Sequence, residues 1–128
     1  MKTNEPNPKA YPLAPKELET ELYNLIQAAI KQGQIRRGAN EAAKALNKGR
    51  AEIIVLAADT EPIEIVLHLP LLCEDKNIPF VFVSSRSALG RAWWVTRSVS
   101  ALAITADDRS PLEKQILKIR DAIEQIPI

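Results

Sequence analysis

A chain of 128 residues, of which 46% are hydrophobic and 26% charged, fits one globular domain with a single core, and this composition excludes a disordered chain. The formal net charge is only +1, so the total charge gives no sign of a polyanionic partner. The single cysteine, Cys73, excludes an internal disulfide bond.

The sequence predicts neither a secretory signal peptide nor a membrane span. Residues Met1–Asn7 are polar and lack the apolar run of a signal peptide. No stretch approaches the roughly 18 consecutive apolar residues that a membrane helix needs. We therefore expect an intracellular, soluble protein that does not contact membranes.

The first third of the chain predicts an arm followed by a helix. Four prolines within residues 1–15 indicate an extended N-terminal arm, and we expect a single domain over residues 16–128. Lys16–Lys31 has apolar residues at helical spacing, and Gly33 is suited to end that helix.

The next segments predict a helix and a buried strand. A short link, Gln34–Arg37, leads to a second helix over Ala39–Lys48, closed by Gly49. Glu52–Ala57 is rich in β-branched residues, which is typical of a buried strand.

The middle of the chain repeats this alternation. The segment Asp59–Pro62 is expected to open a third helix that runs to about Lys76, since proline suits the first turn of a helix. Pro79–Val83 predicts a second strand, and Ser85–Ala92 predicts a short helix.

The last third predicts one strand and one helix. Val99–Thr105 is a third apolar strand, and Pro111–Gln125 carries an apolar stripe at helical spacing. Helices that alternate with apolar strands indicate an α/β domain with helices on both faces of a mixed sheet.

Charge is unevenly distributed along the chain. Lys31–Arg50 contains six basic residues and one acid, whereas Asp59–Asp75 contains five acids and no lysine or arginine. Ser84–Ser98 contains three arginines and no acid. A basic patch of this kind can follow RNA phosphates. The same pattern is also typical of a solvated helix face.

The helix after Gly38 carries the most informative pattern. Residues of a helix step by about 100°, so one side should face the core through Ala39, Ala42, Ala43 and Leu46. The opposite side carries polar groups at Asn40, Glu41, Lys44, Asn47 and Lys48.

These groups suit contacts with bases. An Asn amide donates and accepts, a Glu carboxylate accepts and a Lys ammonium donates, while a helix N-terminus favours phosphate. Gly38 has no side chain and would allow close approach of a ligand. The alternative interpretation is structural: Gly38 as a turn residue, Asn40 as a helix cap, and Glu41 with Lys44 as an i,i+3 surface pair.

The run Arg36–Lys44 (RRGANEAAK) resembles the signature of the L7Ae family of kink-turn RNA-binding proteins. Further stretches are similar to the family, and these are Asn7–Leu13, Ala57–Glu64, His68–Asn77 and Ala88–Ala92. The similarity spans nearly the whole chain. It is greatest to the eukaryotic branch shared by the spliceosomal tri-snRNP and the box C/D small nucleolar ribonucleoproteins.

The resemblance implies a three-layer α/β/α sandwich with a four-stranded mixed sheet, in which the Gln34–Arg37 link is the fourth strand. It also implies contacts with the two sheared G·A pairs of the kink-turn from Asn40, Glu41 and Lys44. Gly38, with Arg36 or Arg37, would lie against the RNA backbone.

The resemblance further implies a pocket for a base flipped out of the stack. Glu61 and Ile65 would line this pocket, and Arg86, Val95 and Arg97 would close it from the loop side. Such contacts agree with RNA physics, because proteins read splayed bases and irregular shape more readily than the closed A-form major groove.

Two positions depart from the family pattern. The family usually has Cys-Gly where this chain has Trp93-Trp94, and its close relatives have proline at the position of Ser98. Two tryptophans add a large apolar surface that can pack on the domain, stack on RNA or contact a protein. The geometry of the neighbouring Val95 and Arg97 is therefore open.

Other reactive residues do not form a recognisable site. His68 is the only histidine, and with Cys73 it does not complete a zinc site, so a packing or partner contact is favoured. Cys73 is expected to be buried and unreactive. No phosphate-binding glycine loop or serine elbow is present. We expect no cofactor and no metal.

Three functions follow, and the first is preferred. It is a non-catalytic kink-turn binder that nucleates ribonucleoprotein assembly in pre-mRNA splicing and rRNA processing, as a monomer outside the particle. The resemblance implies Nop-domain partners, with His68 in the contact face, and a nuclear and nucleolar location. The second is a small α/β enzyme acting on nucleotides or RNA. The third is a protein-binding adaptor that uses Trp93-Trp94, with an incidental basic patch.

Overall fold

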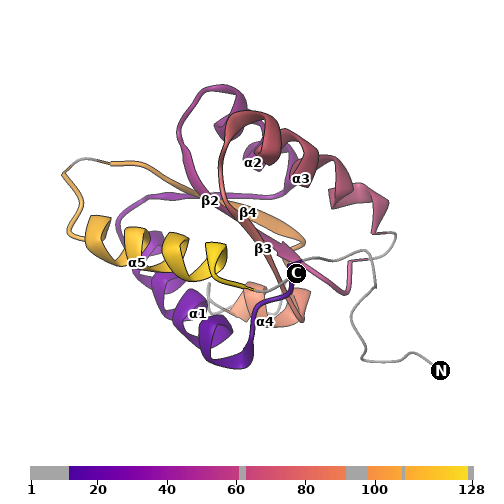
Figure 1. Cartoon of the computed structure of the whole chain (residues 1–128), viewed down its shortest axis with the longest axis horizontal. Coiled ribbons are helices and arrows are strands. Elements are labelled where there is room, and N and C mark those ends of the chain that lie inside the picture. The colour runs from indigo at the N-terminus through magenta and orange to yellow at the C-terminus, as the bar shows by residue number, and fades with distance from the viewer. Residues whose placement is uncertain (1–11, 61–62, 92–97, 108, 127–128) are drawn as a thin grey trace.

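The computed structural model of the protein describes residues 12–60, 63–91, 98–107 and 109–126, and its helices and strands form three layers (Figure 1). The elements in chain order are α1 (Lys16–Lys31), β1 (Ile35–Arg37), α2 (Ala39–Asn47), β2 (Ala51–Ala57), α3 (Glu64–Lys76), β3 (Phe80–Val83), α4 (Arg86–Arg91), β4 (Ala101–Thr105) and α5 (Glu113–Glu124).

The central layer is a four-stranded mixed sheet with the order β1-β4-β2-β3. β4 runs antiparallel to β1 and β2, and β2 runs parallel to β3. The expected α/β/α sandwich is therefore confirmed, and so is the fourth strand at Gln34–Arg37, which the structure places at Ile35–Arg37 as β1.

Alternate residues of β2, β3 and β4 enter two separate cores. Ile53 and Val55 of β2 pack against α1 and α5, while Ile54 and Leu56 pack against α2 and α3 on the other face (Figure 1). This follows from the two-residue period of a strand. Burial of each large aliphatic side chain contributes about 1.5–3 kcal/mol relative to exposure.

Small residues let α2 approach the sheet closely. Ala42 and Ala45 of α2 are buried in one cluster with Ala101 and Ala103 of β4. Leu46 is buried beside them, and Ala39 and Ala43 are partly buried, as the helical wheel predicts. Dense packing fixes this face inward and therefore turns the polar face of α2 to solvent.

The segment before α1 covers one edge of the sheet. Leu13 forms a parallel bridge with Phe82 of β3. The Phe82 amide donates to the Pro12 carbonyl, and the Ala14 amide donates to the Phe82 carbonyl, both at 2.8 Å. Residues 12–14 are thus extended and paired with β3, and Ala14 is buried in the core.

The third helix and the last strand begin later than predicted, for local reasons. The third helix was expected to open within Asp59–Pro62, but α3 begins at Glu64 because Thr60 first closes a turn. Its hydroxyl donates to the Ala57 carbonyl at 2.8 Å. Strand β4 begins at Ala101 rather than Val99, because the Val99 amide donates to the Arg86 carbonyl instead of a neighbouring strand.

Among the described residues, no helix is both long and apolar enough to cross a membrane.

Candidate nucleic-acid interface

The chain segments that carry the predicted site leave the sheet at one end of its strands, and this end is called the edge of the site below. β1, β2 and β3 end where β4 begins, because β4 runs against its neighbours and β2 runs parallel to β3. Hydrogen bonds tie these ends together: the Gly38 amide donates to the Ala101 carbonyl at 2.7 Å, and the Ala57 amide donates to the Ser100 carbonyl at 2.8 Å. The start of α2 and the loops after β2 and β3 therefore share this edge.

Gly38 joins β1 to α2 in a backbone conformation that other residues avoid. Its φ is 102° and its ψ is 155°, a region populated almost only by glycine. A Cβ added at this position would have no atom within 4 Å. Conformation, rather than crowding, thus requires glycine here, and the space in front of it is open to a ligand.

The N-terminus of α2 is uncapped by any side chain. Gly38 is the residue at the N-cap position, and its carbonyl accepts the first helical bond from the Ala42 amide at 2.9 Å. The alternative that Asn40 caps this helix is therefore wrong. The preceding amides of the first turn have no helical acceptor, and with the helix dipole they give this end a partial positive charge.

Three predicted side chains lie together on the exposed face of α2. Asn40, Glu41 and Lys44 are all exposed. The Lys44 ammonium lies 3.4 Å from a Glu41 carboxylate oxygen, and the two side chains are 66% and 48% exposed. This is the i,i+3 surface pair of the structural interpretation. Such exposed pairs contribute at most about 1 kcal/mol, so both groups stay available to a ligand.

Arg36 and Arg37 lie in the short edge strand β1 and are exposed. They directly precede Gly38 in the chain, and as neighbours in a strand they turn their side chains to opposite faces of the sheet. Guanidinium groups suit phosphate because they donate several N–H bonds from one plane.

Arg86 begins α4 and is tied to the loop after β2. Its backbone amide donates to the Asp59 carboxylate at 2.8 Å, and its Nε lies 3.7 Å from the same oxygen. The side chain is 35% exposed. This ion pair holds the start of α4 against the edge that also carries Gly38.

The remaining predicted site residues lie outside the described part of the chain, and their roles stay predictions. They are Glu61, Val95 and Arg97 for the base pocket, with Trp93 and Trp94 as the proposed partner contact. Ile65 falls in the first turn of α3, but its side chain also lies outside the description.

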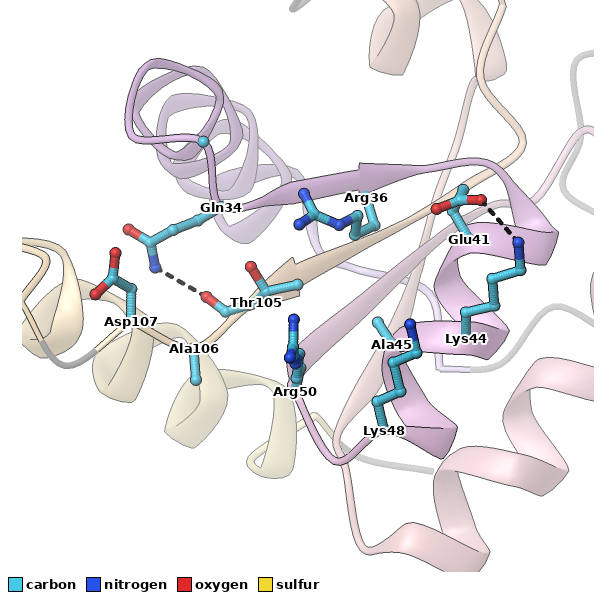
Figure 2. A pocket seen from close by; sticks show the side chains of 11 residues that line it. Gln34, Arg36, Glu41, Lys44, Ala45, Lys48, Arg50, Thr105, Ala106 and Asp107 are labelled. Carbon is cyan, nitrogen blue, oxygen red and sulfur yellow. Dashed lines mark hydrogen bonds and ion pairs between the residues drawn. The ribbon is translucent and has the colours of Figure 1, made fainter.

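Residues not predicted as site residues gather in a cavity of about 290 Å³ beside α2 (Figure 2). Gln34, Lys48, Arg50 and Thr105 line it together with the predicted Arg36, Glu41 and Lys44. Alternation along the strands could have predicted part of this lining. Ile35 and Ile104 pack in the core beneath α1, so the residues next to them in the chain must face α2. These neighbours are Gln34, Arg36 and Thr105.

The outer side of α3 forms a second exposed surface, separate from the polar face of α2. His68 is exposed, its contact with a partner stays a prediction, and Leu71 on the same helix is 71% exposed. Within the described ranges, no group of three His, Cys, Asp or Glu residues is placed to hold a metal ion.

Cys73 is buried, as predicted, and is expected to make stability depend on pH. Burial, with a smaller effect of the Glu74 charge, raises the pKa of its thiol from 9.0 to about 12. In the unfolded chain the thiol ionises near its ordinary pKa, so between about 9 and 12 the unfolded chain loses a proton that the folded protein keeps.

The free energy of unfolding should therefore fall more steeply above pH 9 in the wild type than in Cys73→Ala. Urea unfolding of both proteins at pH 8, 9.5 and 10.5 measures this difference, and other titrating groups cancel in it. If the free energy of unfolding changed with pH in the same way in both proteins, the raised pKa of the Cys73 thiol would be contradicted. Rapid labelling of the thiol in the folded protein would contradict its burial.

Comparison with known proteins identifies the family of this chain. Residues 20–113 match the model of the ribosomal protein L7Ae/L30e/S12e/Gadd45 family, and the chain belongs to this family. The resemblance stated from the motifs is thereby confirmed.

Individual relatives cover almost the full length. The chain is 55% identical to the NHP2-like protein 1 homolog of Drosophila melanogaster over 97% of this chain and 98% of that protein. It is 57% identical to the small nuclear ribonucleoprotein associated homolog 13 of Caenorhabditis elegans, over 95% of each chain. The second name describes a ribonucleoprotein-associated protein and neither name describes an enzyme, in agreement with the expected non-enzymatic role.

The solved structure of a 15.5 kDa RNA-binding protein from Giardia lamblia has the same fold. Its TM-score is 0.89 at 45% sequence identity, and the alignment covers 94% of this chain and 99% of that chain.

Proposed function

We propose that this protein binds kink-turn RNA and acts as a non-catalytic core component of a ribonucleoprotein particle. The observation that carries the proposal is the start of α2, where Gly38 leaves open space in front of an uncapped helix N-terminus with Asn40, Glu41 and Lys44 exposed beside it. Family membership and the similarity to a ribonucleoprotein-associated protein and to an RNA-binding protein support it.

Each group of the site has a role in this proposal. The Asn40 amide and the Glu41 carboxylate bond the base edges of the sheared G·A pairs, since one donates and accepts and the other accepts from amino groups. The Lys44 ammonium then leaves Glu41 for a base or phosphate. The free amides of the α2 N-terminus and the arginines of β1 hold the backbone.

The flipped-out base would occupy a pocket at the same edge of the sheet. Ser98 and Val99 follow the segment of Val95 and Arg97, and Thr60 precedes Glu61. The Val99 amide donates to the Arg86 carbonyl, and the Ala57 amide donates to the Ser100 carbonyl. The residues on either side of the predicted pocket segments therefore lie close to each other. Glu61, Ile65, Arg86, Val95 and Arg97 are the residues proposed for this base.

A second surface is proposed for a protein partner. The outer side of α3 combines His68 and the exposed Leu71 with the exposed acids Glu74 and Asp75. We propose that a Nop-domain protein reads this surface together with the bound RNA, in spliceosomal and box C/D particles of the nucleus and nucleolus. A role of Trp93 or Trp94 in the same contact is part of this proposal.

The test is an RNA titration with a matched pair of asparagine variants. Asn40→Ala should raise the Kd for a kink-turn RNA by about tenfold or more, because a base-edge contact contributes about 1–3 kcal/mol. Asn47→Ala removes the same amide from the exposed far end of α2 and should change the Kd less than twofold. Trp93→Ala should also have less effect than Asn40→Ala.

The control RNA replaces the G·A pairs with Watson–Crick pairs at the same salt concentration, since backbone binding alone depends on salt. The wild type should bind this control much more weakly, and Asn40→Ala should narrow the difference. Equal Kd values of the wild type for both RNAs would rule out recognition of the kink-turn.

A further inference from the structure

The cavity beside α2 extends the proposed interface away from the loops. β1, the outer side of α2, the turn before β2 and the end of β4 enclose it (Figure 2). Arg36 and Lys44 come from the proposed interface, while Lys48 and Arg50 lie beyond it toward the C-terminal end of α2. Its volume of about 290 Å³ is near the lower end of small-ligand sites, roughly 300–1,000 Å³.

Positive charge in this cavity is not balanced by its own acids. Four cations, Arg36, Lys44, Lys48 and Arg50, face two carboxylates, Glu41 and Asp107. Of the ion pairs among the described residues, only that between Lys44 and Glu41 lies here. Cations gathered in a concave surface raise the local potential and attract an anion.

One wall of the cavity holds an unused hydrogen-bond acceptor. Gln34 is 2% exposed, and its Nε2 donates to the Thr105 carbonyl at 2.8 Å. This bond fixes the orientation of the amide. Its Oε1 is buried without a partner among the described residues, and a buried polar atom left unpaired costs about 1–3 kcal/mol. A ligand that brings a hydrogen-bond donor would satisfy it.

We propose that this cavity binds the ribose-phosphate backbone of the RNA strand that flanks the kink-turn. Arg36, Lys48 and Arg50 hold phosphate oxygens, and the Gln34 Oε1 accepts a hydrogen bond from a ribose 2′-hydroxyl. A strand crossing the polar face of α2 reaches the cavity along the same helix, because Lys44 borders both. The inference rests on the proposed function and names a further part of the RNA, outside the internal loop.

The test compares a kink-turn RNA with an extended flanking stem and one truncated to the internal loop. Lys48→Ala combined with Arg50→Ala should raise the Kd for the extended RNA about tenfold. The slope of log Kd against log salt should fall by about 0.7–0.9 for each phosphate that the variant no longer neutralises. The Kd for the truncated RNA should change less than twofold.

The matched control is Lys114→Ala with Lys118→Ala, which removes the same charge from exposed positions on α5. It should leave both Kd values unchanged. If the Lys48 and Arg50 variant binds the extended RNA as the wild type does, while Asn40→Ala still weakens binding, the cavity is not an RNA site and the proposed function stands. Absence of binding of the wild type to either RNA overturns both proposals.

Two further measurements identify which chemical group the cavity binds. Deoxyribose in the flanking strand should raise the wild-type Kd about threefold, in the range of one hydrogen bond, and should not affect Gln34→Met, whose folding is checked by thermal unfolding. If deoxyribose raised the Kd of Gln34→Met by the same factor, the proposed contact between the Gln34 Oε1 and the ribose 2′-hydroxyl would be wrong. Inorganic phosphate alone, added at 10-fold excess over the RNA, should not displace the extended stem; displacement would mark a site for free phosphate.

Discussion

Replacing Gly38 by alanine is expected to lower the free energy of unfolding by about 1–3 kcal/mol, measured by urea unfolding. The Cβ would meet no atom within 4 Å, so the loss comes from the backbone, whose φ of 102° and ψ of 155° disfavour any side chain. The strained residue relaxes by shifting the start of α2. RNA binding should therefore weaken as well, at a temperature where the variant remains folded.

Gly49→Ala is the matched control at the other end of α2. Gly49 also has a positive φ, 70°, and open space around it, but this value is close to the left-handed helical region that other residues occasionally adopt. Its loss of stability should be smaller and its RNA affinity unchanged. Equal losses in both variants would show that the conformation of Gly38 has no special role.

Replacing Phe82 by alanine is expected to lower the free energy of unfolding by about 3–5 kcal/mol, the range for a large aromatic side chain removed from a core. Phe82 is 0% exposed and packs in the cluster beneath α2 and α3. Its backbone also pairs with Pro12 and Ala14. Loss of the ring therefore loosens both the core under the RNA-facing helix and the docking of the N-terminal segment.

Phe80→Ala provides the comparison, because Phe80 lies two residues away on the same face of β3 and is only partly buried. It should lose clearly less stability than Phe82→Ala in the same urea titration. Amide exchange at Ala14 should quicken in Phe82→Ala and not in Phe80→Ala. Equal losses would mean that the ring of Phe82 is not the centre of this core.

Periodic segments of the sequence allowed the helices and three strands to be predicted. The α1 boundaries, Lys16–Lys31, agree with the expectation because apolar residues at helical spacing and the following glycine both act locally. β1 has only three residues, too few for a period, and its pairing with β4 joins residues far apart in the chain. That strand was expected only through family resemblance.

The polar face of α2 was predictable for the same local reason, since one helix positions Asn40, Glu41 and Lys44. The cavity was not, because its lining comes from several elements. Gln34 and Thr105 meet only when β1 pairs with β4, and Arg50 joins them through the turn before β2. The distribution of charge along the chain revealed the basic run but not which cations share a concave surface.

The two borders of the sheet have a consequence for the behaviour of the protein at high concentration. The outer strand β3 is already paired with residues 12–14, and the opposite strand β1 is three residues long and carries two arginines. Exposed strand borders are where chains add to one another and form aggregates, and short or charged strands resist this. Removing residues 1–14 should therefore make the protein prone to self-association through β3, whereas the full chain should stay dispersed before RNA is available.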